Sequence, residues 1–175
     1  KQYRQEVSPR VDLLLDVSSS MFVGELKAQR VWELAYFCTQ SALRLGASLR
    51  VFAIGSKGRE VPLEHVLGGD WQLEKGSLES PNGPRLDQLP LRSGALRVLI
   101  SDLLFPAAPE LLVNPLTHNK SRGIIFVPFS KEESQPDWTG NIEFDDSETA
   151  KLDKRRVDAA TLAKYHQAYQ RHFDL

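Results

Sequence analysis

Four short apolar runs, each bounded by polar or turn-forming residues, constrain what this sequence can fold into. They are Val11–Leu15, Leu49–Ile54, Leu96–Ile100 and Ile124–Val127. Near-continuous apolar runs of this length are typical of strands buried on both faces of a parallel sheet. The first two runs flank a long helical pattern from about Gly24 to Leu45, and strands alternating with helices indicate an α/β protein. We therefore predict a Rossmann-like three-layer sandwich, with a mostly parallel central sheet and helices on both faces.

The middle of the chain carries weaker patterns. Residues 56–94 are rich in glycine, proline and charge, which is typical of turns and loops. Within them we expect a short strand near Glu60–Leu63 and a short helix near Leu86–Leu89. A further short helix is expected over Pro109–Leu116.

The C-terminal part combines one alternating segment, one basic segment and one helical segment. Asn141–Phe144 alternates polar and apolar residues, as an edge strand does. Lys151–Arg156 holds four basic residues, which we interpret as a solvated connector. Asp158 is a suitable N-cap for a closing helix that ends at about Phe173.

Length and composition indicate a soluble globular protein. The 175 residues suit one domain, 1–175, and the formal net charge is −1. This balance speaks against a nucleic-acid partner or direct contact with an anionic membrane. Cys38 is the single cysteine, which favours a reducing, cytoplasmic location. Because the chain begins with Lys1, we expect a fragment of a longer protein, and a membrane anchor outside this segment stays open.

Two of the predicted strands end in an acidic residue accompanied by hydroxyl groups. Asp16 is followed by Ser18 and Ser20, and Asp102 is preceded by Ser101. Since parallel strands end at the same edge of a sheet, these side chains should meet there. Carboxylate and hydroxyl oxygens are hard ligands of the kind that Mg²⁺ prefers. We therefore predict a site for Mg²⁺, or another divalent cation, at Asp16, Ser18, Ser20 and Asp102.

The pattern Asp16-x-Ser18-x-Ser20, between an apolar strand and a long helix, resembles the metal-ion-dependent adhesion site of von Willebrand factor A domains. The resemblance implies that both serines bind the cation directly. It also implies that Asp16 and Asp102 act mostly through water, and that one position stays open for an acidic group of a partner protein.

One ligand of that family has no clear match here. The family uses a threonine from a middle loop, whereas the corresponding region of this chain has no threonine and offers Ser77 and Ser80. Either of them is a possible third hydroxyl ligand.

A narrower resemblance extends over nearly the whole chain. The segments Asp16–Met21, Lys27-Ala28, Leu99–Asp102 and Gly140–Thr149, and a closing helix with Tyr165, are similar to the bacterial family called domain of unknown function 58. Genes of that family commonly lie beside genes for MoxR-type AAA+ ATPases. The resemblance thus implies a partner role in the assembly or maturation of other proteins.

An enzyme is the alternative, for example a metal-dependent hydrolase or phosphatase on the same fold. Phosphatases of the haloacid dehalogenase type need a second aspartate where this chain has Ser18. The turn also lacks the flanking glycines of a serine-hydrolase elbow, and the chain has no P-loop pattern. We therefore expect a non-catalytic binding module with no active-site residues.

Overall fold

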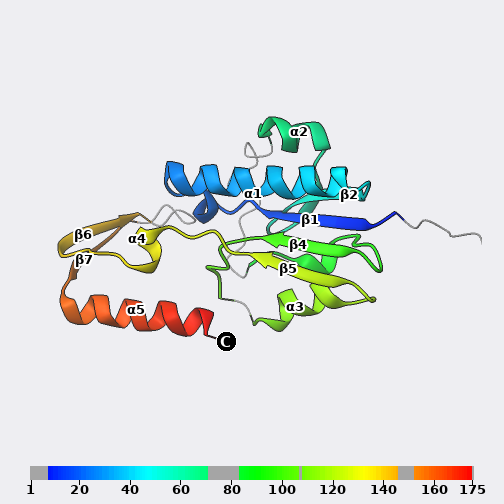
Figure 1. Ribbon diagram of the computed structural model, residues 1–175. Coiled ribbons are helices and arrows are strands. Elements are labelled where there is room, and N and C mark those ends of the chain that lie inside the picture. The colour runs from blue at the N-terminus through cyan, green and yellow to red at the C-terminus, as the bar shows by residue number, and fades with distance from the viewer. Residues whose placement is uncertain (1–7, 71–82, 107, 146–151, 175) are drawn as a thin grey trace, which may run out of the picture. The chain divides into compact units, whose positions relative to one another are not determined.

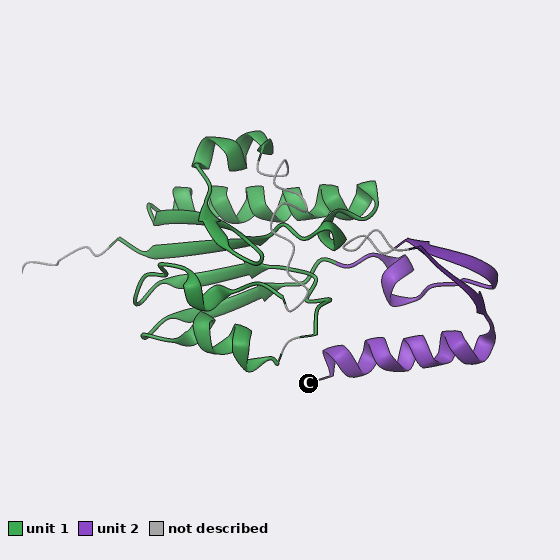
Figure 2. Ribbon diagram, turned by 180° about the vertical axis from the view of Figure 1, so that it is seen from behind, with its two compact units in different colours: residues 1–128 green, residues 129–175 purple. Residues whose placement is uncertain are grey.

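The computed structural model describes residues 8–70, 83–106, 108–145 and 152–174. Contacts between residues divide the chain into two compact units, 1–128 and 129–175 (Figure 2). Each unit is described by itself below. The expectation that residues 1–175 form one domain stays a prediction.

A five-stranded sheet forms the centre of the first unit. Its strand order is β3-β2-β1-β4-β5, in which β1, β2, β4 and β5 run parallel and β3 is an antiparallel edge strand. The strands are β1 (Arg10–Asp16), β2 (Ser48–Ile54), β3 (Gly58–Glu60), β4 (Leu96–Ile100) and β5 (Arg122–Phe126). The order 3-2-1-4-5 is that of doubly wound α/β sheets. The predicted mostly parallel Rossmann-like sheet is thus confirmed.

Helices cover both faces of this sheet, which makes three layers (Figure 1). One face carries α1 (Glu25–Arg44) and α2 (Leu63–Gly68), and the other carries the 3₁₀ turn η3 (Leu86–Gln88) and α3 (Glu110–Thr117). Successive residues of a strand point to opposite faces, so Leu13 and Leu15 of β1 join the core under α1 while Leu14 joins the core under α3. Burial on both sides explains the apolar run in this strand.

The second unit is a small assembly held together by aromatic side chains. It contains α4 (Lys131–Ser134), the antiparallel pair β6 (Gly140–Asp145) and β7 (Leu152–Val157), and α5 (Ala159–Phe173). Ring centroids lie 5.0–6.2 Å apart along a row that starts at β6 and continues along α5. The row consists of Phe144, Trp138, Tyr165, Tyr169 and Phe173. Tyr165 Oη also donates a hydrogen bond to the carbonyl of Glu133, at 2.6 Å.

Two predictions about the weaker segments were wrong. The basic segment 151–156 is not a connector, because residues 152–157 form β7, whose charges are exposed and show no apolar alternation that reveals a strand. The strand expected near Glu60–Leu63 ends at Glu60, and helix α2 begins at Leu63. Pro62 at its N-cap and Gly69 at its C-cap, with φ 82°, bound this short helix. The strand over Asn141–Phe144 exists, but it belongs to the separate two-stranded sheet.

An ion pair between a buried aspartate and a partly exposed arginine anchors the amino-terminal end of β1. Asp12 is fully buried, and its carboxylate accepts hydrogen bonds from Arg92 Nε and from the Arg92 backbone N–H, both at 2.8 Å. Arg92 also donates to the carbonyl groups of Val11 and Ser48. The loop before β4 is thereby tied to β1 and β2, because a buried carboxylate requires such partners.

Arg92→Met should lower the free energy of unfolding by about 3–5 kcal/mol, because it leaves the Asp12 carboxylate buried without its counter-ion. Urea denaturation followed by circular dichroism measures this change. Arg85→Met removes an exposed arginine that is paired with Asp87, and it should leave the midpoint unchanged. Equal midpoints for both variants would show that the Arg92–Asp12 pair stabilises the fold no more than the exposed Arg85–Asp87 pair does.

Candidate metal centre

The candidate site lies where β1 and β4 end side by side. The register pairs Leu15 with Ile100, so the next residues, Asp16 and Ser101, are neighbours. Ser101 Oγ donates a hydrogen bond of 2.6 Å to Asp16 Oδ2 in a buried environment. β1 leads into α1 on one face of the sheet and β4 leads into α3 on the other face, which makes this edge the topological switch point. Ligand sites of doubly wound sheets lie at such points.

The turn after β1 presents two serine hydroxyls beside Asp16. The backbone N–H of Ser18 donates to Asp16 Oδ1 at 2.9 Å, which fixes the turn on the carboxylate. Ser18 Oγ and Ser20 Oγ lie 3.1 Å apart and share a hydrogen bond. The turn continues as the 3₁₀ element η1 (Ser19–Phe22), whose Met21 and Phe22 are buried and hold it against the core.

Asp102 is held by partners from three sides. Its Oδ2 accepts a hydrogen bond of 2.9 Å from Lys27 Nζ on α1, and both side chains are almost fully buried. Its Oδ1 accepts from the backbone N–H of Leu104 at 3.1 Å. The backbone N–H of Asp102 points to Met21 Sδ, at 3.0 Å. The carboxylate is therefore held rigidly in place.

The backbone after β4 adopts a conformation that leucine rarely takes. Leu103 has φ 58°, and its N–H donates to Ser101 Oγ at 3.1 Å. A left-handed non-glycine residue costs about 1 kcal/mol or more, and such strain concentrates at functional turns. Here it allows two successive side chains, Ser101 and Asp102, to accept bonds from the turn that follows them.

The two carboxylates are close enough to influence each other. The pKa of Asp16 is raised to about 6, mainly by burial and also by the nearby Asp102 charge, although hydrogen bonds from Ser101 and Ser18 oppose this rise. A raised pKa shows that the ionised form lacks full compensation in the folded chain. Asp102 has a counter-ion in Lys27, whereas the bonds described for Asp16 come from neutral donors.

The donor atoms fit a small divalent cation. Two neighbouring ligands of an octahedral ion with bonds of 2.0–2.1 Å lie about 2.9 Å apart, close to the 3.1 Å between the two serine hydroxyls. Each carboxylate oxygen that already accepts a hydrogen bond has a lone pair left for a coordinated water. Within the described residues, no group of three or more His, Cys, Asp or Glu is arranged to hold a metal. A cation here would therefore depend on Ser18 and Ser20.

The structure thus brings Asp16, Ser18, Ser20 and Asp102 to one edge of the sheet, as the sequence predicts. Their binding of a metal stays a prediction. The possible third hydroxyl ligands, Ser77 and Ser80, lie outside the described residues.

Sequence reasoning missed Lys27 as a member of this group. It shares the buried stripe of α1 with Val31 and Ala35 at four-residue spacing. A lysine on an apolar helix face is the signal that could have indicated a buried counter-ion.

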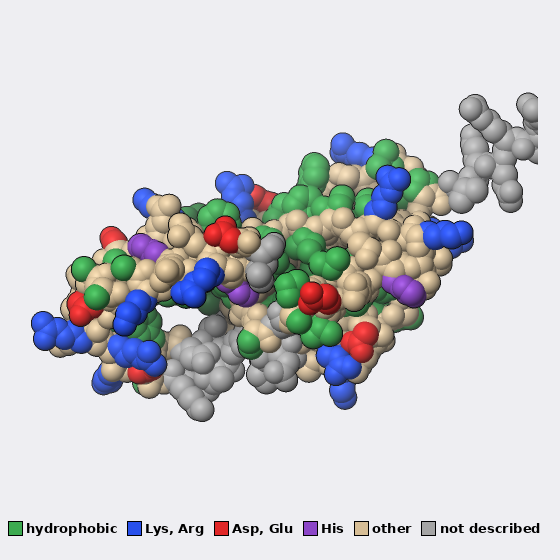
Figure 3. All heavy atoms as spheres, turned by 90° about the horizontal axis from the view of Figure 1, so that it is seen from below, with side chains coloured by type: hydrophobic (Ala, Val, Ile, Leu, Met, Phe, Trp, Pro, Cys, Tyr) green, Lys and Arg blue, Asp and Glu red, His purple; other side chains and the backbone are tan. Residues whose placement is uncertain are grey.

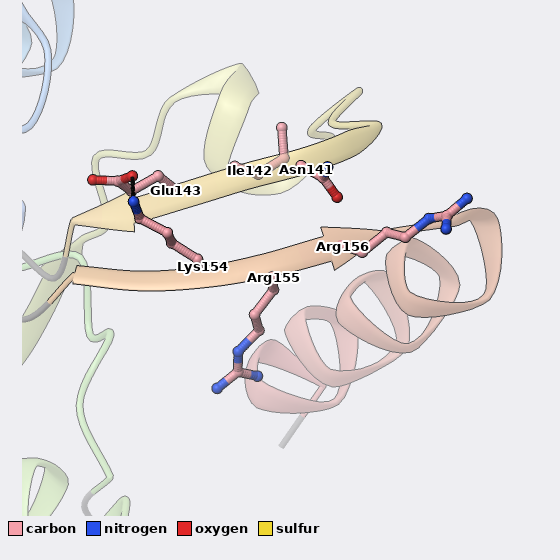
Figure 4. A pocket seen from close by; sticks show the side chains of 6 residues that line it. All are labelled: Asn141, Ile142, Glu143, Lys154, Arg155 and Arg156. Atoms are coloured by element: carbon pink, nitrogen blue, oxygen red, sulfur yellow. Dashed lines mark ion pairs between the residues drawn. The ribbon is translucent and has the colours of Figure 1, made fainter.

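A second polar hollow lies on the β6–β7 ribbon. It has a volume of about 330 Å³ and is lined by six residues (Figure 4): Asn141, Ile142, Glu143, Lys154, Arg155 and Arg156. Lys154 pairs with Glu143 at 2.9 Å, and Arg155 pairs with Asp153 at 2.6 Å. Because acidic neighbours offset two of its cations, this hollow is a poor candidate for a phosphate site.

Comparisons with known proteins add little. No family model and no curated protein matches the chain. Among solved structures it is similar to an aerotolerance-related membrane protein from Bacteroides fragilis NCTC 9343 with multiple mutations to serines. The identity is 11%, the match covers 93% of this chain and 89% of that chain, and the TM-score is 0.49. Similarity at this level carries no conclusion about function, so the fold assignment rests on the strand order. None of the described helices is long and apolar enough to cross a bilayer.

Ser101→Ala should lower the free energy of unfolding by about 1.5–3 kcal/mol, because the buried Asp16 carboxylate loses a charge-assisted hydrogen bond. Chemical denaturation provides the measurement. The matched control is Ser93→Ala, since Ser93 is exposed and donates to the carbonyl of Asn119. If the two substitutions cost the same, the Ser101–Asp16 bond does not stabilise the site.

Proposed function

We propose that this chain is a von Willebrand factor A-type binding module that uses a divalent cation to bind a partner protein. The observation that carries the proposal is the pair of serine hydroxyls 3.1 Å apart beside Asp16, at the switch point of a doubly wound sheet. Its membership of the domain-of-unknown-function-58 family, its action beside a MoxR-type AAA+ ATPase and its cytoplasmic location are part of the same proposal. They rest on the sequence resemblance and, for the location, on the single cysteine.

Four residues of this chain would hold the cation. Ser18 and Ser20 offer hydroxyl oxygens as direct ligands, while Asp16 and Asp102 offer carboxylate oxygens for coordinated waters. The cation would act as a Lewis acid that binds a carboxylate of the partner. Mg²⁺ and Mn²⁺ suit such an all-oxygen donor set.

Exposed apolar side chains next to the site support a protein as the partner. Val23 and Leu26, which follow Ser20 closely in sequence, are 50% and 79% exposed, and Leu104, two residues after Asp102, is 37% exposed. Exposed apolar groups around a polar centre are typical of protein interfaces. The face shown in Figure 3 carries hydrophobic side chains among charges of both signs. That mixture, with a net charge of −1, disfavours a nucleic acid.

A hydrolase is the weaker proposal on this site. Phosphatases of the haloacid dehalogenase type need a second aspartate where this turn has Ser18, and the turn lacks the flanking glycines of a serine-hydrolase elbow. We therefore propose that the module is not an enzyme, and steady turnover of a phosphoester that Asp16→Ala abolishes would refute this.

Mg²⁺ or Mn²⁺ at about 100 times its dissociation constant should raise the melting temperature by roughly 5–10 °C, because binding to the folded state adds about 2.7 kcal/mol. The double variant Ser18→Ala/Ser20→Ala should lose this rise. Its two hydroxyls bond to each other, so their joint removal leaves neither of them without its partner. Differential scanning calorimetry with each metal and with EDTA measures the shift.

Ser93→Ala, at the opposite edge of the sheet, should keep the full metal-dependent shift. If the melting temperature of the wild-type chain stays the same with both metals, the proposal of a metal-dependent module is wrong. A shift that survives in the double variant would place the cation elsewhere.

Leu26→Ser should weaken binding to the purified MoxR-type ATPase of the same organism at least tenfold, because an exposed leucine loses about 1.5–3 kcal/mol of burial at the interface. Leu45→Ser is the control, since Leu45 is 75% exposed and follows the other end of α1. Biolayer interferometry with Mg²⁺ or EDTA measures the dissociation constant of each variant for the ATPase. If the two substitutions weaken binding equally, the apolar side chains beside the site do not form the contact with the ATPase.

A further inference from the structure

Lys27 forms a buried ion pair inside the candidate metal centre. Its Nζ lies 2.9 Å from Asp102 Oδ2, and the two side chains are 1% and 2% exposed. It comes from the first turn of α1, directly after the serine turn. Water screens a buried ammonium group little, so its field reaches the other members of the site.

The charge of Lys27 offsets one of the two carboxylates. With Asp16 ionised, the pair Asp16 and Asp102 with Lys27 leaves a net charge of −1 at the site. Cation affinity of an all-oxygen site depends on the number of negative ligands. The ammonium therefore acts against a cation in two ways: it repels the ion, and it occupies one lone-pair direction of Asp102.

We propose that Lys27 is a positioning residue that sets the cation affinity of this site, holding Asp102 in place at the expense of tight metal binding. The inference rests on the proposed function, since it concerns the same cation. The site would then bind its metal weakly when alone, and a partner carboxylate would supply the negative charge that Lys27 has offset. Such a site favours metal and partner together over either alone, because each lowers the cost of binding the other.

The decisive variant is Lys27→Gln, which keeps a hydrogen-bond donor for Asp102 and removes the charge. A positive charge close to a divalent cation repels it, and a repulsion of about 1.4 kcal/mol is a factor of ten in affinity. The dissociation constant for Mn²⁺, measured on the full chain by electron paramagnetic resonance, should therefore fall at least tenfold. Isothermal titration with Mg²⁺ should show the same direction.

Arg30→Gln is the matched control, because it removes the same charge from the exposed side of α1, where Arg30 pairs with Glu33. It should change the dissociation constant less than twofold. If wild type binds Mn²⁺ and folded Lys27→Gln binds it equally or more weakly, the role of Lys27 is refuted while the metal site stands. If neither chain binds Mn²⁺ or Mg²⁺, the proposed function fails, and the role of Lys27 with it.

Lys27→Gln weakens a buried ion pair, so the variant can be unfolded without metal. Circular dichroism with increasing Mn²⁺ then decides the question. A chain that folds as Mn²⁺ is added supports the proposal, because metal binding is then coupled to folding. A chain that stays unfolded at 100 times the wild-type dissociation constant overturns it.

Discussion

The buried carboxylates at the two ends of β1 are the constraint on which the rest of the structure depends. Asp12 and Asp16 both sit on the central strand, and neither can remain buried without partners. The two carboxylates have different kinds of partner. Asp12 receives an arginine, which joins a loop to two strands. Asp16 receives hydrogen bonds from a serine hydroxyl and a backbone N–H. The first arrangement gives the carboxylate a positively charged partner, whereas the second surrounds Asp16 with neutral donors at the edge where doubly wound sheets carry their ligand sites.

Several contacts hold the polar side chains at the carboxyl ends of β1 and β4 in place. The parallel register makes Asp16 and Ser101 neighbours, and Ser101 in turn accepts a bond from the strained turn at Leu103. Asp102 is fixed by α1 through Lys27 and by η1 through Met21. Each polar group of the site is therefore positioned by an element with its own buried residues. A cation would enter a centre that is already formed, which keeps the entropic cost of binding low.

Much of the first unit could be predicted from the sequence, because its signals are long or strongly periodic. The apolar runs predict four strands, and the common direction of parallel strands places Asp16 and Asp102 at the same edge of the sheet. The failures have physical reasons. Strand β7 is entirely polar except at its ends, so no alternation marks it, and α2 is only six residues long. Lys27 and Arg92 were overlooked as partners, since long basic side chains are usually exposed and only tertiary pairing reveals the exceptions.

The carboxylates and hydroxyls around Lys27 can be interpreted as a purely structural cluster or as a centre that binds a cation. If the centre were only structural, a carboxylate with a buried ammonium partner would be sufficient for Asp102, and a hydrogen bond would account for the 3.1 Å between the hydroxyls of Ser18 and Ser20. The same separation also matches adjacent ligands on an octahedral ion, and Val23 and Leu26, which follow Ser20 closely in sequence, are exposed. The proposal that another protein completes the centre accounts together for the spaced oxygens, the offset charge and the exposed apolar side chains.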